Sequence, residues 1–163
     1  QGVMDGTLEM AIVTLAPHPV EQLQVVELWR DRLCFVCAKD HPLAQRSRAD
    51  DKPLSLAELC EVNCILPGAK TFTRTLIGQR FEEAGLNLPV SMSTNYLETL
   101  KMMCGVGLGW SLLPEKMLDS ELVALPVDTA TIHRPLGYLV HNNRTLSNAA
   151  RKMIEQLEAN RET

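Results

Sequence analysis

Two short polar stretches hold the residues whose types and spacing could bind a ligand. Residues 70–74 read Lys-Thr-Phe-Thr-Arg and residues 93–95 read Ser-Thr-Asn, and each stretch follows an apolar run and precedes a segment with helical periodicity. Such a position places free backbone N–H groups and hydroxyls at the positive end of a helix. Two such helix ends facing one cleft would hold a small anion, with Lys70 or Arg74 adding positive charge.

Ordinary helix capping is the alternative interpretation of the same residues. Thr71 or Thr73 can cap the first helix, and Thr94 or Asn95 can cap the second. Phe72 would line a pocket wall in the first interpretation, and it would be a core or staple residue in the second. The local sequence leaves both interpretations open.

The cysteines favour a buried, non-catalytic role. Cys34 and Cys37 form a Cys-x-x-Cys pattern, but residues 33–38 are apolar and predict a buried strand. Residues three apart in a strand face opposite sides, so these thiols should diverge, whereas redox pairs of this pattern lie at a helix start. The other cysteines lack a histidine at metal-ligand spacing. The odd total of five excludes full pairing and indicates a reducing compartment, so we predict a cytoplasmic protein with no metal and no cofactor.

The remaining candidates for chemistry predict no catalytic residue. The glycines at 105, 107 and 109 follow a predicted helix and open a strand. A dinucleotide-binding loop follows a strand and opens a helix, so this run predicts a helix C-terminal turn instead. None of the four histidines has a serine or cysteine partner at a strand-to-helix elbow. A hydrolase or a transferase is therefore disfavoured.

Composition bounds the class of protein that carries these stretches. The chain has 163 residues and 18.1 kDa, with 45% hydrophobic and 22% charged residues, which predicts one domain or two small lobes. A net charge of −4 and a pI of about 5.6 argue against direct nucleic-acid binding by these residues, because such domains are basic. The apolar runs are too short for a membrane helix, and the first residues lack a signal-peptide pattern. The chain begins without Met, so we expect a piece of a longer protein.

Strands and helices alternate along the sequence, which predicts the α/β class with a largely parallel sheet. Ser55 with Glu58 predicts a capping box, Gly85 predicts a helix end, and the charged residues 45–53 predict a surface loop. Helices are expected at 56–60, at 71–84, from 94 or 95 to 104 and from 147 onward, and strands at 8–14, 23–29, 33–38, 62–66, 90–92, 110–113, 122–125 and 136–140.

Five segments, in one order and covering nearly the whole chain, resemble the effector-binding domain of LysR-type transcriptional regulators. They are Asp5-Gly6-Thr7-Leu8-Glu9-Met10-Ala11-Ile12; Asp31-x-Leu33-x-Phe35-Val36 with His41-Pro42-Leu43-Ala44; Ile65-Leu66-Pro67 with Thr73-Arg74 and Phe81-x-x-Ala84-Gly85; Glu98-Thr99-Leu100-Lys101 running to Gly105-Val106-Gly107-Leu108-Gly109-Trp110-Ser111-Leu112-Leu113-Pro114; and Arg134-Pro135-Leu136-Gly137 leading to Arg144-Thr145-Leu146-Ser147-x-Ala149-Ala150-Arg151.

The resemblance implies a two-lobed fold like that of type II periplasmic binding proteins. Crossover strands near 37–41 and 130–134 would join lobe II, at 42–130, to lobe I, at 1–41 plus 131–163. The family's domain begins with a further strand, helix and strand, and its DNA-binding winged helix-turn-helix precedes them. Neither segment is in this sequence, so lobe I is expected to be incomplete.

The resemblance also implies a function. A small, anionic effector would bind in the inter-lobe cleft and modulate DNA binding through the absent N-terminal domain, in a homodimer or tetramer with no membrane partner and no enzymatic activity. A solute-binding protein of the same fold is the alternative, and a redox switch at Cys34 and Cys37 is disfavoured by strand geometry. The effector-binding residues carried over from the family are Lys70, Thr71, Phe72, Thr73, Thr94 and Asn95 in lobe II, and Thr14 and Leu15 in lobe I.

Overall fold

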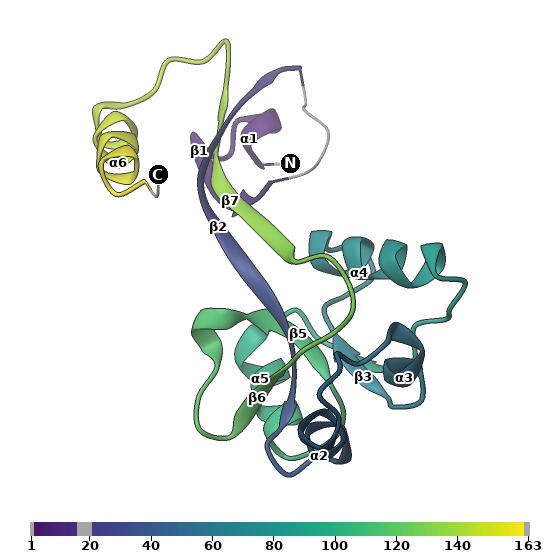
Figure 1. Ribbon diagram of the computed structural model, residues 1–163. Helices are drawn as coiled ribbons and strands as arrows, with labels where there is room; N and C mark the ends of the chain where they lie inside the picture. Colours follow the sequence, from purple (N-terminus) through teal and green to yellow (C-terminus); the bar gives the residue numbers. More distant parts are fainter. Residues whose placement is uncertain (1, 16–20, 162–163) are drawn as a thin grey trace. The chain divides into compact units, whose positions relative to one another are not determined.

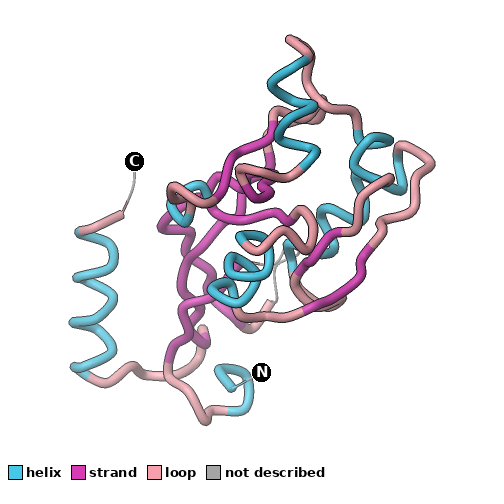
Figure 2. Tube along the Cα trace, turned by 90° about the horizontal axis from the view of Figure 1, so that it is seen from below, coloured by secondary structure: helices cyan, strands magenta, loops and turns pink. Residues whose placement is uncertain are grey.

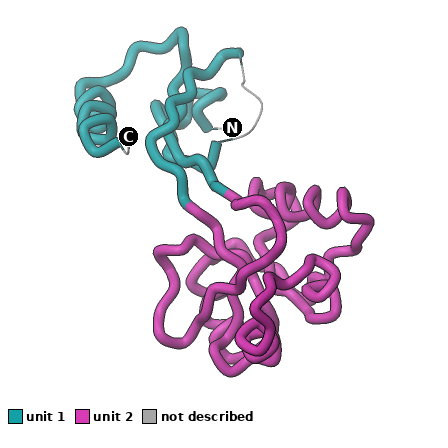
Figure 3. The backbone as a smooth tube through the Cα atoms, viewed as in Figure 1, with its two compact units in different colours: residues 1–31, 133–163 teal, residues 32–132 magenta. Residues whose placement is uncertain are grey.

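The computed structural model describes residues 2–15 and 21–161. The chain forms two compact units, called here unit 1 (Gln1–Asp31 with His133–Thr163) and unit 2 (Arg32–Ile132) (Figure 3). One long strand, residues 23–38, runs from unit 1 into unit 2 without a break. The correspondence of the two units to the predicted lobes stays a prediction.

Unit 1 is built on three neighbouring strands. β1 (Met10–Thr14) pairs antiparallel with β7 (Ile132–His141), and β7 lies beside β2 (Leu23–Ala38) (Figure 1). At Gly137 the backbones approach so closely that a Cβ would lie 2.0 Å from the carbonyl oxygen of Val26. Only glycine fits at this position, which explains the one small residue within an apolar strand.

Two helices complete the described part of unit 1. α1 (Gly2–Asp5) is a single turn that the sequence did not predict. α6 (Asn148–Ala159) begins at the predicted place, because the Ser147 hydroxyl oxygen accepts a hydrogen bond from the backbone N–H of Ala150 at 3.2 Å. The buried cluster of this unit consists of Leu28, Tyr138 and Val140, with Leu146, Ile154 and Leu157 packed against it.

Unit 2 contains the second part of β2 and four further strands. β5 (Ser111–Pro114) and β6 (Leu122–Leu125) each pair antiparallel with β2, while β3 (Cys64–Leu66) and β4 (Val90–Ser93) form a separate parallel pair. The expectation of a largely parallel sheet is therefore wrong. Parallel neighbours need a crossover connection, and a helix provides it between β3 and β4. β2 enters from unit 1 and runs antiparallel to β5 and β6, its partners in unit 2.

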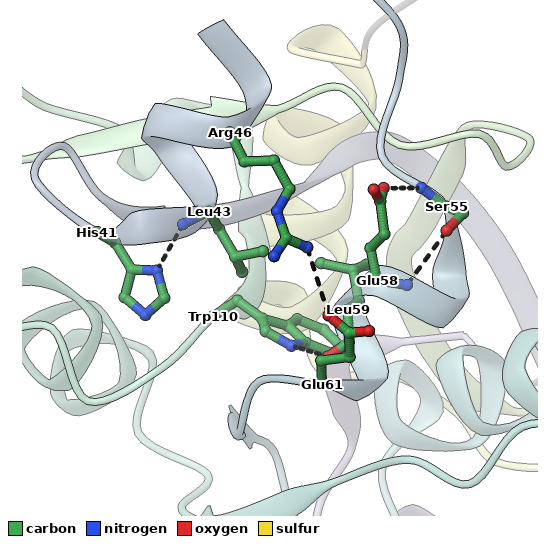
Figure 4. A network of polar contacts seen from close by, with 8 residues as sticks. All are labelled: His41, Leu43, Arg46, Ser55, Glu58, Leu59, Glu61 and Trp110. Carbon is green, nitrogen blue, oxygen red and sulfur yellow. Dashed lines mark hydrogen bonds and ion pairs between the residues drawn. The ribbon is translucent and has the colours of Figure 1, made fainter. Parts of the chain in front are cut away.

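α2 (Pro42–Ala49) occupies part of the segment 45–53 that was predicted to be a loop. The Nδ1 atom of His41 accepts a hydrogen bond from the backbone N–H of Leu43 at 3.1 Å, and Pro42 occupies the first helical position, where its missing N–H is harmless (Figure 4). Leu43 and Ala44 are buried. Only the first turn of α2 is apolar, and the rest is mostly charged or polar. The composition of residues 45–49 therefore resembles that of a surface loop.

α3 (Leu56–Cys60) has the predicted bounds, and its capping box is confirmed. The hydroxyl of Ser55 accepts from the backbone N–H of Glu58 at 3.2 Å, and the carboxylate of Glu58 accepts from the backbone N–H of Ser55 at 2.8 Å (Figure 4). An ion pair of 3.5 Å between Arg46 and Glu61 links α2 to the end of α3.

Trp110 lies at the centre of the unit 2 core. Its side chain is fully buried, and its Nε1–H donates to the carbonyl oxygens of Leu59 and Val62, both at 3.0 Å. The ring centroid lies 5.7 Å from that of Phe35 and 5.9 Å from that of Phe81. The core thus joins β2, α3 and the helix after β3, and it supports the loops between them.

α4 (Phe72–Glu83) follows β3, and α5 (Leu97–Gly105) follows β4. Figure 2 distinguishes the helices, in cyan, from the strands, in magenta. α4 agrees with the predicted 71–84 to within one residue at each end, and Gly85 ends it with a φ of 72°. η1 (Glu115–Met117) is a short 3-10 turn after β5. Among the described residues, no helix is both long and apolar enough to cross a membrane.

Candidate functional site

The two polar stretches of the sequence lie side by side in unit 2. β3 and β4 are parallel neighbours with Leu66 opposite Ser93, so their carboxyl ends meet at one edge. The backbone N–H of Thr94 donates to the carbonyl oxygen of Leu66 at 3.2 Å, which extends the pairing past the end of β4. The loops that leave these ends, residues 67–71 and 94–96, are called the paired loops below.

A side-chain hydrogen bond joins the paired loops directly. The Oδ1 atom of Asn95 accepts from the backbone N–H of Gly68 at 2.8 Å. A Cβ at Gly68 would lie 3.0 Å from the same oxygen, so a larger residue would press on this bond. Arg74 adds a second link, because its Nη1 donates to the carbonyl oxygen of Pro67 at 3.1 Å and to the hydroxyl of Ser93 at 3.2 Å.

Helix capping explains one of the two predicted helix starts. Thr71 is the N-cap of α4: its hydroxyl accepts from the backbone N–H of Arg74 at 3.2 Å and donates to the carbonyl oxygen of Gly68 at 2.8 Å. The second helix does not begin at Thr94 or Asn95, since α5 starts at Leu97 after a residue with no side-chain cap. The Thr94 hydroxyl accepts instead from the backbone N–H of Tyr96, at 3.3 Å, and Asn95 makes the bridge described above.

Lys70 is the cation that remains available at the paired loops. Among the residues that the structure describes, its exposed ammonium has no hydrogen-bond or ion-pair partner, whereas Arg74 is engaged with the loop backbone. The backbone N–H groups of Phe72 and Thr73, at the start of α4, likewise have no acceptor in the described part of the chain. Phe72 is half-buried and Thr73 is buried. This arrangement can accept a small anion without breaking an existing bond.

The other two predicted site residues belong to unit 1. Thr14 ends β1 opposite Leu136, and the backbone N–H of Leu15 donates to the carbonyl oxygen of Pro135 at 2.9 Å. Leu15 is buried and Thr14 is half-buried. Their contribution to an effector site stays a prediction.

The cysteines are free thiols, and the two of the Cys-x-x-Cys pattern diverge as the strand geometry predicted. Cys37 packs in the cluster around Trp110, while Cys34 packs against the cluster that contains Val36. Burial raises the pKa of Cys37 to about 11 and the pKa values of Cys64 and Cys104 to about 12. These thiols are protonated at neutral pH, which makes them poor nucleophiles.

The sequence did not identify Gly68, Ser93 or Arg74 as the groups that hold the site together. The dipeptide Pro67-Gly68 was a signal for a turn, but its partner Asn95 lies far along the chain, and only the parallel pairing of β3 with β4 brings them together. Within the described residues, no group of three or more His, Cys, Asp or Glu side chains is arranged to hold a metal ion.

The chain is similar to known proteins over nearly its full length. A family profile described as the LysR substrate binding domain matches residues 1–162. A probable RuBisCO transcriptional regulator of Thalassiosira pseudonana is 26% identical over 89% of this chain and 46% of its own length. The chain spans about half the length of the curated relatives it matches.

Solved structures show the same fold at low sequence identity. The regulatory domain of CcmR from Synechocystis PCC6803, in complex with 2-PG, gives a TM-score of 0.82 at 20% identity, over 99% of this chain and 77% of that one. The effector-binding domain of QuiR, in complex with shikimate, gives 0.80 at 16% identity, over 97% and 74%. With the profile match over nearly its full length, the chain belongs to the family of LysR substrate-binding domains, the effector-binding domains of LysR-type transcriptional regulators.

Proposed function

We propose that this chain is the sensory part of a transcriptional regulator and that it binds a small organic anion at the paired loops of unit 2. The observation that carries the proposal is the bond between Asn95 and Gly68, which fixes the two loops while Lys70 stays unpaired beside the start of α4. A carboxylate or phosphate there would gain the Lys70 charge and the N–H groups of Phe72 and Thr73.

The role of Thr71 in this proposal is to position the loop. Its hydroxyl already donates to the carbonyl oxygen of Gly68 and accepts from the backbone N–H of Arg74. It therefore holds the backbone in place rather than contacting the anion. Thr94 and Asn95 act in the same way from the second loop. Preorganised loops bind more tightly than mobile ones, because less conformational entropy is lost on binding.

Sensing requires that the ligand favours one of two conformations of the protein. β2 and β7 each run from one unit into the other. A ligand that binds more tightly to one arrangement of these strands would increase the population of the conformation that has it. We propose that this shift is transmitted, in a cytoplasmic homo-oligomer, to a DNA-binding segment of the full-length regulator. The CcmR and QuiR domains, whose structures are in complex with 2-PG and with shikimate, support a small-molecule effector class.

Isothermal titration calorimetry with shikimate and with inorganic phosphate tests the site. At least one of these anions should bind, and Lys70→Gln should weaken that binding by about tenfold, the effect of losing roughly 1.4 kcal/mol from a charge-assisted contact. Lys52→Gln removes an exposed lysine elsewhere in unit 2 and should leave the affinity unchanged. Equal affinity of the wild type and Lys70→Gln would reject the site, and binding of neither anion would reject the proposed ligand class.

A further inference from the structure

Unit 2 has a cavity that none of the paired-loop residues lines. It has a volume of about 350 Å³. It is lined by residues 32–35 of β2 together with residues 124–127 and 129–132, which run from the end of β6 to the first residue of β7. That volume is in the range of small-ligand sites, roughly 300–1,000 Å³. Nothing in the proposed effector site uses these residues.

The floor of this cavity is apolar and part of the core. Phe35, Leu125 and Ile132 line it, and each is more than nine-tenths buried in the cluster around Trp110. Core side chains keep fixed rotamers, so this floor has the same shape with or without a ligand.

The wall formed by residues 126–130 is held from behind by two sets of bonds. The backbone of Leu54 donates to the carbonyl oxygen of Pro126 and accepts from the N–H of Asp128, both at 2.8 Å. The Nη1 atom of Arg80, on α4, donates to the hydroxyl of Thr129 and to the carbonyl oxygen of Ala130, both at 2.9 Å. The cavity is therefore a preformed site rather than a gap between mobile segments.

One unpaired cation lies at the cavity. Arg32 is exposed, and among the described residues it has no hydrogen-bond or ion-pair partner. Two charges of opposite sign act on its neighbour Cys34. Burial and the carboxylate of Glu115 raise the pKa of the Cys34 thiol, and the guanidinium of Arg32 lowers it. A ligand carboxylate would meet attraction from Arg32, which lines the cavity, and repulsion from Glu115, which has the larger effect on Cys34 but lies outside the lining.

We propose that this cavity is a second ligand site, for a small monocarboxylate with an apolar body. The guanidinium of Arg32 presents a planar pair of N–H donors that matches a carboxylate. Phe35, Leu125 and Ile132 supply the apolar contact for the rest of the molecule. The site is independent of Lys70 and of the paired loops, so it stands whether or not the proposed effector site does.

Cys34 gives a direct readout of occupancy, because it lines the cavity and is half-buried rather than inaccessible. The rate of its alkylation by iodoacetamide is measured by peptide mass spectrometry with cyclohexanecarboxylate as the probe. A bound probe should slow the reaction by 1 + [L]/Kd, about 11-fold at roughly 10 times the Kd. Cys60, also half-buried but outside the cavity, is the internal control and should react at an unchanged rate.

Variants and a neutral probe separate the outcomes. Arg32→Gln should abolish the protection of Cys34 by the probe, whereas Lys52→Gln should keep it. Cyclohexylmethanol, which lacks the negative charge, should give little protection of Cys34 in the wild type. Arg32→Lys, which keeps the charge without the planar donor pair, should retain partial protection of Cys34, and it replaces Arg32→Gln if that variant fails to fold.

No protection of Cys34 in the wild type, or equal protection by the alcohol, overturns the carboxylate site. Protection that Lys70→Gln removes and Arg32→Gln does not would place the probe at the paired loops and also overturn it.

Discussion

The hydroxyl of Thr71 serves the fold and the proposed site at once. It accepts from the backbone N–H of Arg74 at 3.2 Å and donates to the carbonyl oxygen of Gly68 at 2.8 Å. Thr71→Ala removes the N-cap of α4 and should lower the free energy of unfolding by about 1 kcal/mol, whereas Thr71→Ser should preserve it. Urea unfolding of the three proteins measures this difference. If alanine and serine were equally tolerated, the hydroxyl would have no capping role.

At the same scale, the sequence predicted which residues could form a site but not how they connect. Residues 70–73 and 94–95 could be identified because polar groups after apolar runs mark the ends of strands. The bridge from Asn95 to Gly68 could not be predicted, since it depends on the register of β3 with β4, which shifts between Cys64 and Ile65. For the same reason, a helix was expected to begin at Thr94 or Asn95, whereas α5 begins at Leu97 and Asn95 bonds to Gly68.

At the scale of elements, the start of α2 depends on a titratable group, the imidazole of His41. His41 accepts from the backbone N–H of Leu43 through Nδ1, which requires the neutral ring, and burial lowers the pKa of His41 below its usual 6.5. A pKa lowered by folding contributes stability above the unfolded value of 6.5, and that contribution is lost as the pH falls through the lower folded value. We expect hydrogen exchange in residues 43–49 to rise, relative to α3, as the pH falls below 6.5.

His41→Asn is the matched variant for this prediction. Asparagine caps a helix through its side-chain oxygen and does not titrate, so α2 should stay protected and its pH dependence should vanish. Hydrogen-exchange mass spectrometry, corrected for the intrinsic pH dependence of exchange, compares the two proteins. A pH response of equal size in His41→Asn would show that another group controls α2.

Elements with local signals were predictable, and elements decided by distant contacts were not. The capping box of Ser55 with Glu58 and the cap at Ser147 are local, and both helices begin where the sequence indicated. β2 was expected as two strands, because the charged residues Arg30, Asp31 and Arg32 interrupt its apolar pattern. It forms one strand because its first part pairs within unit 1 and its second part pairs with β5 and β6 in unit 2.

At the scale of the whole molecule, an ion pair ties together the two strands that join the units. Asp31 on β2 accepts from the Nη2 of Arg134 on β7 at 2.8 Å, and their side chains are only 14% and 17% exposed. The pair between Lys39 and Glu121 is looser, at 3.3 Å, with side chains 44% and 62% exposed. The first pair therefore lies in a region of low dielectric constant, where the loss of one partner has a larger effect.

Asp31→Asn should lower the free energy of unfolding by about 2 kcal/mol, less than for a fully buried pair, because it leaves the Arg134 cation with a weaker partner. Glu121→Gln, the exposed control, should change it by about 0–1 kcal/mol. Urea unfolding gives both values, and equal effects would show that burial does not strengthen the first pair. The double variant Asp31→Asn with Arg134→Met should recover most of the loss, because no unpaired charge remains. Such recovery would mean that the loss in Asp31→Asn comes from the uncompensated Arg134 charge, and that the strands' apolar packing supplies the stability.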